Sequence, residues 1–91
     1  MSASLHDNPE LSRFEMDEDG ILAGANYRLA GNVITFTHTE VLPQARGHGL
    51  ASRLIAGALE AVRARGLKVI AHCSFVRGFL AKHPEYHDLR L

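Results

Sequence analysis

Apolar and polar positions along the first half of the chain predict three β-strands. Residues 11–16 form a short candidate strand, which a turn at residues 17–20 closes. Residues 21–29 form a second, and residues 33–42 a third that is rich in β-branched and aromatic side chains. We predict that the three strands make an antiparallel meander. Residues 1–9 are polar, and we expect them to be flexible.

The second half changes to the period of an amphipathic helix, which we predict at residues 49–65. Its apolar stripe consists of Leu50, Leu54, Ala58 and Ala61. Gly66 is suited to a left-handed cap, and residues 67–73 then predict a short strand parallel to residues 33–42 through a right-handed crossover. We expect Ser74 to cap a short helix at residues 75–82 that ends before His83-Pro84. The predicted fold class is therefore mixed α/β.

Length and charge narrow the classes of function. Ninety-one residues suit a single domain spanning residues 1–91. Ten basic and ten acidic residues give no net charge, so nothing indicates nucleic acid as a partner. No apolar stretch is long enough to cross a membrane, and the one cysteine can form no internal disulfide. We expect a cytoplasmic protein, monomeric or homodimeric.

A glycine-rich turn joins the third strand to the long helix. It reads Gln44-Ala45-Arg46-Gly47-His48-Gly49-Leu50-Ala51. Glycine lets a backbone approach a ligand closely, and the free N–H groups and dipole of a helix N-terminus attract phosphate. No Gly-Lys-Ser/Thr follows, and the third glycine of a dinucleotide fold is missing, so we predict a pyrophosphate held mainly by backbone.

This turn and three further segments resemble the GNAT superfamily of N-acetyltransferases, and in particular its minimal single-domain branch. The turn fits the Gln/Arg-x-x-Gly-x-Gly/Ala signature in two registers, from Gln44 and from Arg46. Phe-Thr-His-Thr-Glu-Val at residues 36–41 precedes it, and Cys-Ser-Phe-Val and His-Pro-Glu-Tyr follow at residues 73–76 and 83–86. The resemblance implies an acetyltransferase that uses acetyl-coenzyme A, with pantetheine entering between two splayed parallel strands.

Candidate cofactor contacts follow from the turn and this implied fold. They are Val41, Leu42, Gln44, Ala45, Arg46, Gly47, His48, Gly49, Leu50, Ala51, Ser74 and Arg77. Arg46 can make charge-assisted bonds to pyrophosphate. His48 is either a phosphate contact or a spacer between glycines. Arg77 and Lys82 are either contacts to an outer phosphate of coenzyme A or a solvated helix face. The backbone N–H of Val41 or Leu42 is expected to polarise the thioester carbonyl.

Two side chains are the candidate catalytic residues. On a regularly alternating strand Glu40 shares a face with Ile34, Phe36 and His38, which makes it either a general base for the acceptor amine or a structural carboxylate. Cys73 is either a nucleophile that carries the acetyl group or a small buried side chain near the thioester. Tyr86 is either a proton donor to the leaving thiolate or a packing residue.

Other classes of function stay open beside the enzyme. A coenzyme A binding module without catalysis would keep the turn and lack turnover, and a protein-interaction domain would bind no cofactor. A zinc site is not expected, because Pro84 interrupts any helix that could align His83 with His87. The acceptor amine, small molecule or protein, is not identified by the sequence.

Overall fold

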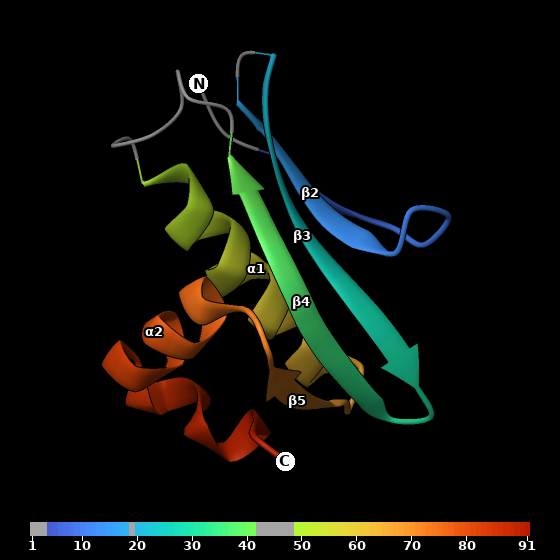
Figure 1. Cartoon of the computed structure of the whole chain (residues 1–91), viewed down its shortest axis with the longest axis vertical. Helices are drawn as coiled ribbons and strands as arrows, with labels where there is room; N and C mark the ends of the chain where they lie inside the picture. The colour runs from blue at the N-terminus through green and yellow to red at the C-terminus, as the bar shows by residue number, and fades with distance from the viewer. Residues whose placement is uncertain (1–3, 19, 42–48) are drawn as a thin grey trace.

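The computed structural model describes residues 4–18, 20–41 and 49–91, which form one sheet with two α-helices on the same side (Figure 1). The strands lie in the order β1-β2-β3-β4-β5. The elements are β1 Ser4–Asn8, β2 Arg13–Glu18, β3 Ile21–Ala30, β4 Val33–Val41, α1 Leu50–Ala64, β5 Lys68–Ala71, α2 Ser74–Lys82 and the 3-10 helix η2 Pro84–Leu89. The predicted mixed α/β class is confirmed.

The antiparallel meander is confirmed, and it has one strand more than predicted. β1 pairs with β2, β2 with β3, and β3 with β4, all antiparallel. The expectation that residues 1–9 are flexible is therefore wrong for residues 4–8, which form β1. Its only large apolar side chain is Leu5, and polar contacts supply the rest: the Tyr27 hydroxyl donates to Asp7 Oδ1 at 2.6 Å. Such cross-strand partners cannot be seen in the periodicity of a short polar segment.

The core lies between the sheet and α1. Phe14, Tyr27 and Phe36 form an aromatic cluster with ring centroids 5.4 to 6.5 Å apart. The helix buries Leu50, Leu54, Ile55, Ala58, Leu59 and Val62 against it, close to the predicted stripe. Gly57 lets β1 approach the helix, because a Cβ at this position would lie 2.7 Å from Leu5 Cδ2. Burial of this face is the main stabilising contribution to the fold.

A β-bulge changes the alternation of β4. Tyr27 pairs with Phe36 and Asn26 with His38, so Thr37 is an extra residue opposite β3. Before the bulge the even residue Phe36 faces the core, whereas beyond it the odd residue Thr39 pairs with the buried Ala25 and faces the helices. The prediction that Glu40 shares a face with Ile34 and Phe36 is therefore wrong. Glu40 lies on the opposite, uncovered face of the sheet.

The parallel strand β5 lies beside β4, as predicted, but it is shorter than residues 67–73. Gly66 before it has a φ of 70°, the expected left-handed conformation. Cys73, with extended backbone, is the N-cap of α2 and makes no side-chain capping bond, so the prediction that Ser74 caps this helix is wrong. The chain ends on the outer edge of β5, where the Leu91 N–H donates to the Val69 carbonyl at 3.0 Å.

Candidate active site

The parallel pair comes apart halfway along β4. The pairing of β4 with β3 extends to Val41, but its pairing with β5 ends at Phe36 and Ala71. The N–H groups of His72 and Cys73 both donate to the Phe36 carbonyl, at 3.0 and 3.1 Å, as the chain turns away into α2. Among the described residues, residues 37–41 thus have a strand partner on one side only. We call their other side the free edge of β4.

Cys73 lies against this free edge. Its Sγ atom is 3.2 Å from the Thr39 hydroxyl, and the residue is buried. Burial by itself raises the pKa of the thiol, but hydrogen bonds from the Thr39 hydroxyl and from backbone N–H groups of β4 and of the first turn of α2 favour the thiolate. The net result is a pKa below the ordinary cysteine value. The structure therefore brings a thiol with a lowered pKa to the point where the two strands separate.

The bulge determines which backbone groups reach the free edge. The Thr39 N–H is among the donors to the Cys73 sulfur, so it points away from β3. Val41, two residues further along the strand, has the same orientation because backbone groups alternate between the two sides of a strand. The Val41 N–H is therefore directed to the free edge. Leu42, the other residue predicted to supply this N–H, lies outside the described residues.

The N-terminus of α1 begins with Gly49, which has a φ of 73° and is the N-cap. The first helical bond runs from the Arg53 N–H to the Gly49 carbonyl, at 3.1 Å. The N–H groups of Leu50, Ala51 and Ser52 precede it and have no intrahelical acceptor. Gln44, Ala45, Arg46, Gly47 and His48, the rest of the predicted cradle, lie outside the described residues.

A cavity of about 300 Å³ separates the first turn of α1 from α2. Its lining includes Ser52, Ser74 and Lys82, together with Phe75, Gly78, Phe79 and His83. The hydroxyls and the ammonium group are suited to an anion. Ser52 was not among the predicted site residues. Its position in the first turn of the helix after the glycine-rich segment was the signal that could have identified it.

Glu40 lies on the far side of the sheet from the helices. It is exposed and pairs with Gly24 of β3. Together with Arg13, Leu22 and Gly24 it lines a cavity of about 130 Å³. Arg13 was not among the predicted site residues either. It belongs to β2, which is three positions from β5 in the sheet order, and the sequence does not show that β2 contributes to the same region as Glu40.

Comparison with known proteins agrees with this arrangement. Residues 13–89 match the GCN5-related N-acetyltransferase family. The chain belongs to this family. Its fold also matches the solution structure of a GCN5-like protein from Staphylococcus aureus that has been proposed to be an N-acetyltransferase. The TM-score is 0.74 at 32% identity, and the match covers 97% of this chain and 87% of the other.

Family membership makes the chain an acyltransferase, and acetyl-coenzyme A is the usual donor in GCN5-related enzymes. The resemblance noted in residues 36–41, 73–76 and 83–86 is confirmed at the level of the family. The free edge of β4, Cys73 and the N-termini of both helices lie within the matched range. Together they form the candidate active site.

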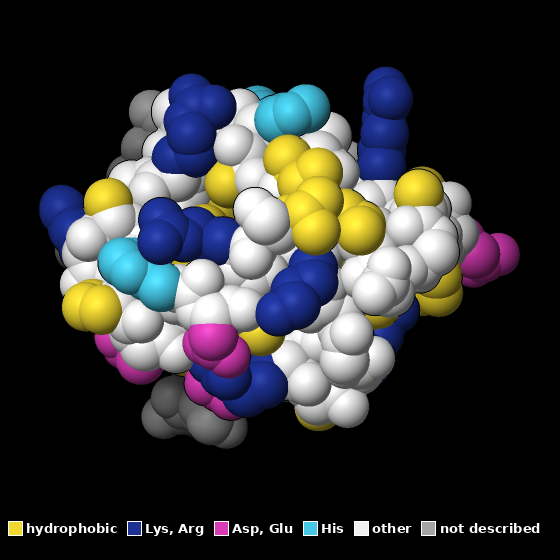
Figure 2. Space-filling view, turned by 90° about the horizontal axis from the view of Figure 1, so that it is seen from below, with side chains coloured by type: hydrophobic (Ala, Val, Ile, Leu, Met, Phe, Trp, Pro, Cys, Tyr) yellow, Lys and Arg dark blue, Asp and Glu magenta, His cyan; other side chains and the backbone are white. Residues whose placement is uncertain are grey.

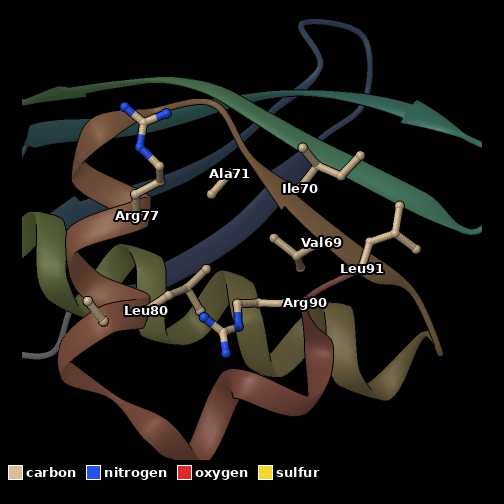
Figure 3. Close-up of a pocket in the computed structure, with 8 residues that line it drawn as sticks. Val69, Ile70, Ala71, Arg77, Leu80, Arg90 and Leu91 are labelled. Carbon is tan, nitrogen blue, oxygen red and sulfur yellow. The ribbon is translucent and has the colours of Figure 1, made fainter.

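Other predicted residues lie away from the free edge. Arg77 donates to the His72 carbonyl at 3.1 Å and lines a cavity of about 370 Å³ on the outer side of β5, beside Arg90 and Leu91 (Figure 3). Figure 2 shows this end of the molecule, with basic side chains around an apolar patch. The Tyr86 hydroxyl donates to Glu60 Oε2 at 2.9 Å, and burial together with this carboxylate raises the pKa of the phenol.

Within residues 4–18, 20–41 and 49–91, no three His, Cys, Asp or Glu side chains cluster in a way that could hold a metal ion. No helix in the same ranges is long and apolar enough to span a membrane.

Proposed function

We propose that this protein transfers an acetyl group from acetyl-coenzyme A to an amine acceptor. The observation that supports it most directly is the free edge of β4, which has Cys73 beside it. Strand backbone that lacks a neighbouring strand can bind an extended ligand as an added strand would. Pantetheine, which carries two amide groups, is such a ligand.

The rest of the cofactor has suitable partners on the helix side. The N–H groups of Leu50, Ala51 and Ser52, which precede the first intrahelical bond, would bind the pyrophosphate, helped by the helix dipole. The cavity with Ser52, Ser74 and Lys82 would hold a further phosphate by charge-assisted bonds. The residues therefore fit coenzyme A in both its amide and its phosphate portions.

Glu40 would remove a proton from the acceptor amine, and the Val41 N–H would stabilise the charge that develops on the carbonyl oxygen. Both residues belong to the last part of β4, but alternation directs the Glu40 side chain to the uncovered face. The acceptor would then approach from that face, while the helices hold the donor from the other. This division keeps the two substrates from competing for one surface.

Binding is tested with a matched pair of glycine variants. Coenzyme A should raise the melting temperature, since a ligand specific to the folded state contributes about 2.7 kcal/mol at a hundredfold excess over its Kd. Gly49 and Gly31 have φ values of 73° and 60°, and no atom lies within 4 Å of a Cβ at either position. Valine should strain both sites similarly, but only Gly49→Val should lose the coenzyme A shift.

Calorimetry that shows no coenzyme A binding to the folded wild type would overturn the proposal. A coenzyme A shift retained in Gly49→Val but lost in Gly31→Val would move the phosphate site away from α1. Turnover is tested by thiol release from acetyl-coenzyme A with a panel of amines.

The role of Cys73 is decided by the route of the acetyl group. We propose direct transfer to the amine, because a cysteine thioester gains little free energy over the thioester of the donor. Cys73→Ala should then retain most of its activity, with a loss of a few fold from altered packing. Acetylated wild-type protein in intact mass spectra, which releases its label to an amine at the rate of turnover, would establish the covalent route instead.

A further inference from the structure

A buried carboxylate lies on the face of the sheet that no helix covers. Glu15 of β2 is only 6% exposed. Its Oε1 atom accepts hydrogen bonds from His6 Nε2 at 2.7 Å and Asn8 Nδ2 at 3.4 Å, and its Oε2 atom accepts one from Arg13 Nε. The Arg13 bond is the largest cause of the lowered pKa of this carboxyl group. Glu15 therefore stays ionised and holds the Arg13 side chain in place.

A glycine makes room for this arginine. Gly24 pairs with Glu15 on one side and with Glu40 on the other, so the three residues form a row across β2, β3 and β4. A Cβ at Gly24 would lie 3.4 Å from Arg13 Cδ, which places the arginine stem over the glycine. The missing side chain leaves the cavity that Arg13, Gly24 and Glu40 line.

Two opposite charges thus line one cavity without forming an ion pair. Within the ranges that the structure describes, Arg13 uses only its Nε atom, in the bond to Glu15, and Glu40 makes no ion pair. Both Nη groups of Arg13 are therefore available for another acceptor. A cavity of about 130 Å³ that is lined by a guanidinium and a carboxylate is complementary to a small ligand that carries both a carboxylate and an amine.

We propose that the acceptor is a small amino acid, whose carboxylate binds the Arg13 guanidinium while its amine lies at Glu40. The inference rests on the proposed acetyl transfer, because Glu40 is its general base. It assigns the substrate class that the reaction itself leaves open. The cavity is well below the roughly 300 to 1,000 Å³ of sites for drug-sized ligands, which favours a short amino acid over a larger acceptor.

Pairs of acceptors that differ only in a carboxylate test whether the protein recognises that group. Glycine, β-alanine and γ-aminobutyrate are compared with methylamine, ethylamine and propylamine, which have the same chain without the carboxylate. At least one amino acid should have a kcat/KM about tenfold or more above that of its amine, as expected for one charge-assisted contact. Equal values across all three pairs, or a preference for a lysine peptide over every amino acid, would contradict the inference and leave acetyl transfer intact.

Two variants test the arginine without removing the charge that Glu15 needs. Arg13→Lys keeps a cation for Glu15 but loses the guanidinium fork, and Gly24→Val fills the cavity from its floor. Arg13→Lys should raise KM for the preferred amino acid about tenfold and leave KM for the matched amine unchanged, whereas Gly24→Val should raise KM for both, because the amine lies in the same cavity. Neither variant should change the circular dichroism spectrum. Arg28→Gln, an exposed arginine on β3, is the control and should change neither KM.

Direct binding separates this inference from the proposed function. Glycine, β-alanine and γ-aminobutyrate are each titrated into the ¹⁵N-labelled protein. At least one of the three should shift the amide resonances of Gly24 and Glu40, and Arg13→Lys should abolish that shift. If these shifts occur but no amine is acetylated, the site stands and acetyl transfer fails. If none of the three amino acids shifts these resonances more than its matched amine does, the site is not an amino acid site.

Discussion

The two halves of β4 belong to one strand but have different surroundings. Residues up to Phe36 are paired on both sides, and Ile34 and Phe36 are fully buried. Beyond the bulge, β3 is its only strand partner in the part of the chain that the structure describes, and His38 and Glu40 are exposed. The first half therefore contributes mainly to stability, whereas the second leaves backbone and polar side chains available to a ligand.

This contrast shows how one strand can contribute both to a core and to a candidate site. A core needs regular pairing and alternation, and a site needs groups that the fold does not already use. The bulge at Thr37 separates the two requirements within a few residues, as bulges next to active sites commonly do. Substitutions on either side of Thr37 should therefore differ in kind.

The largest effect should come from the buried half. Phe36→Ala removes a ring that packs against Phe14 and Tyr27, and truncation of a buried phenylalanine costs about 3–5 kcal/mol. His38→Ala, two residues along and exposed, should change the free energy of unfolding by less than about 0.5 kcal/mol. Urea denaturation of the two variants checks this. Similar losses would mean that the second half is also structural.

Glu40→Gln should affect catalysis and spare stability. The amide keeps the shape of the side chain but cannot accept a proton, so turnover should fall about a hundredfold or more. Coenzyme A affinity and the denaturation midpoint should stay at wild-type values, because Glu40 is exposed and faces away from the helices. A variant with wild-type turnover would reassign Glu40 to a structural role.

The smallest effect concerns the thiol at the boundary between the halves. The rate of Cys73 alkylation against pH should have a midpoint below the ordinary cysteine pKa, and Thr39→Val should raise this pKa because a bond to the thiolate is lost. Since folding lowers this pKa, the stability it contributes is present above the ordinary pKa and is lost as pH falls through the lowered one. An unchanged midpoint in Thr39→Val would leave the backbone N–H groups of β4 and α2 as the source of the effect.

Much of the fold could be predicted because its signals are local. The stripe of α1, the left-handed Gly66 and the helix end before Pro84 each depend on neighbouring residues, and the structure confirms them. β1 could not be predicted in this way. Its strand conformation depends on pairing with β2 and on Tyr27, distant partners that its own composition does not indicate.

By itself the sequence determined the family and the order of most elements, since motifs and periodicity are properties of short segments. Only the tertiary structure decided which face each site residue occupies. One extra residue at Thr37 reverses the alternation of β4, and a bulge is defined by the pairing of two strands rather than by either one. As a result the Thr39 hydroxyl contacts Cys73, and Glu40 lines a cavity together with Arg13 on the uncovered face of the sheet.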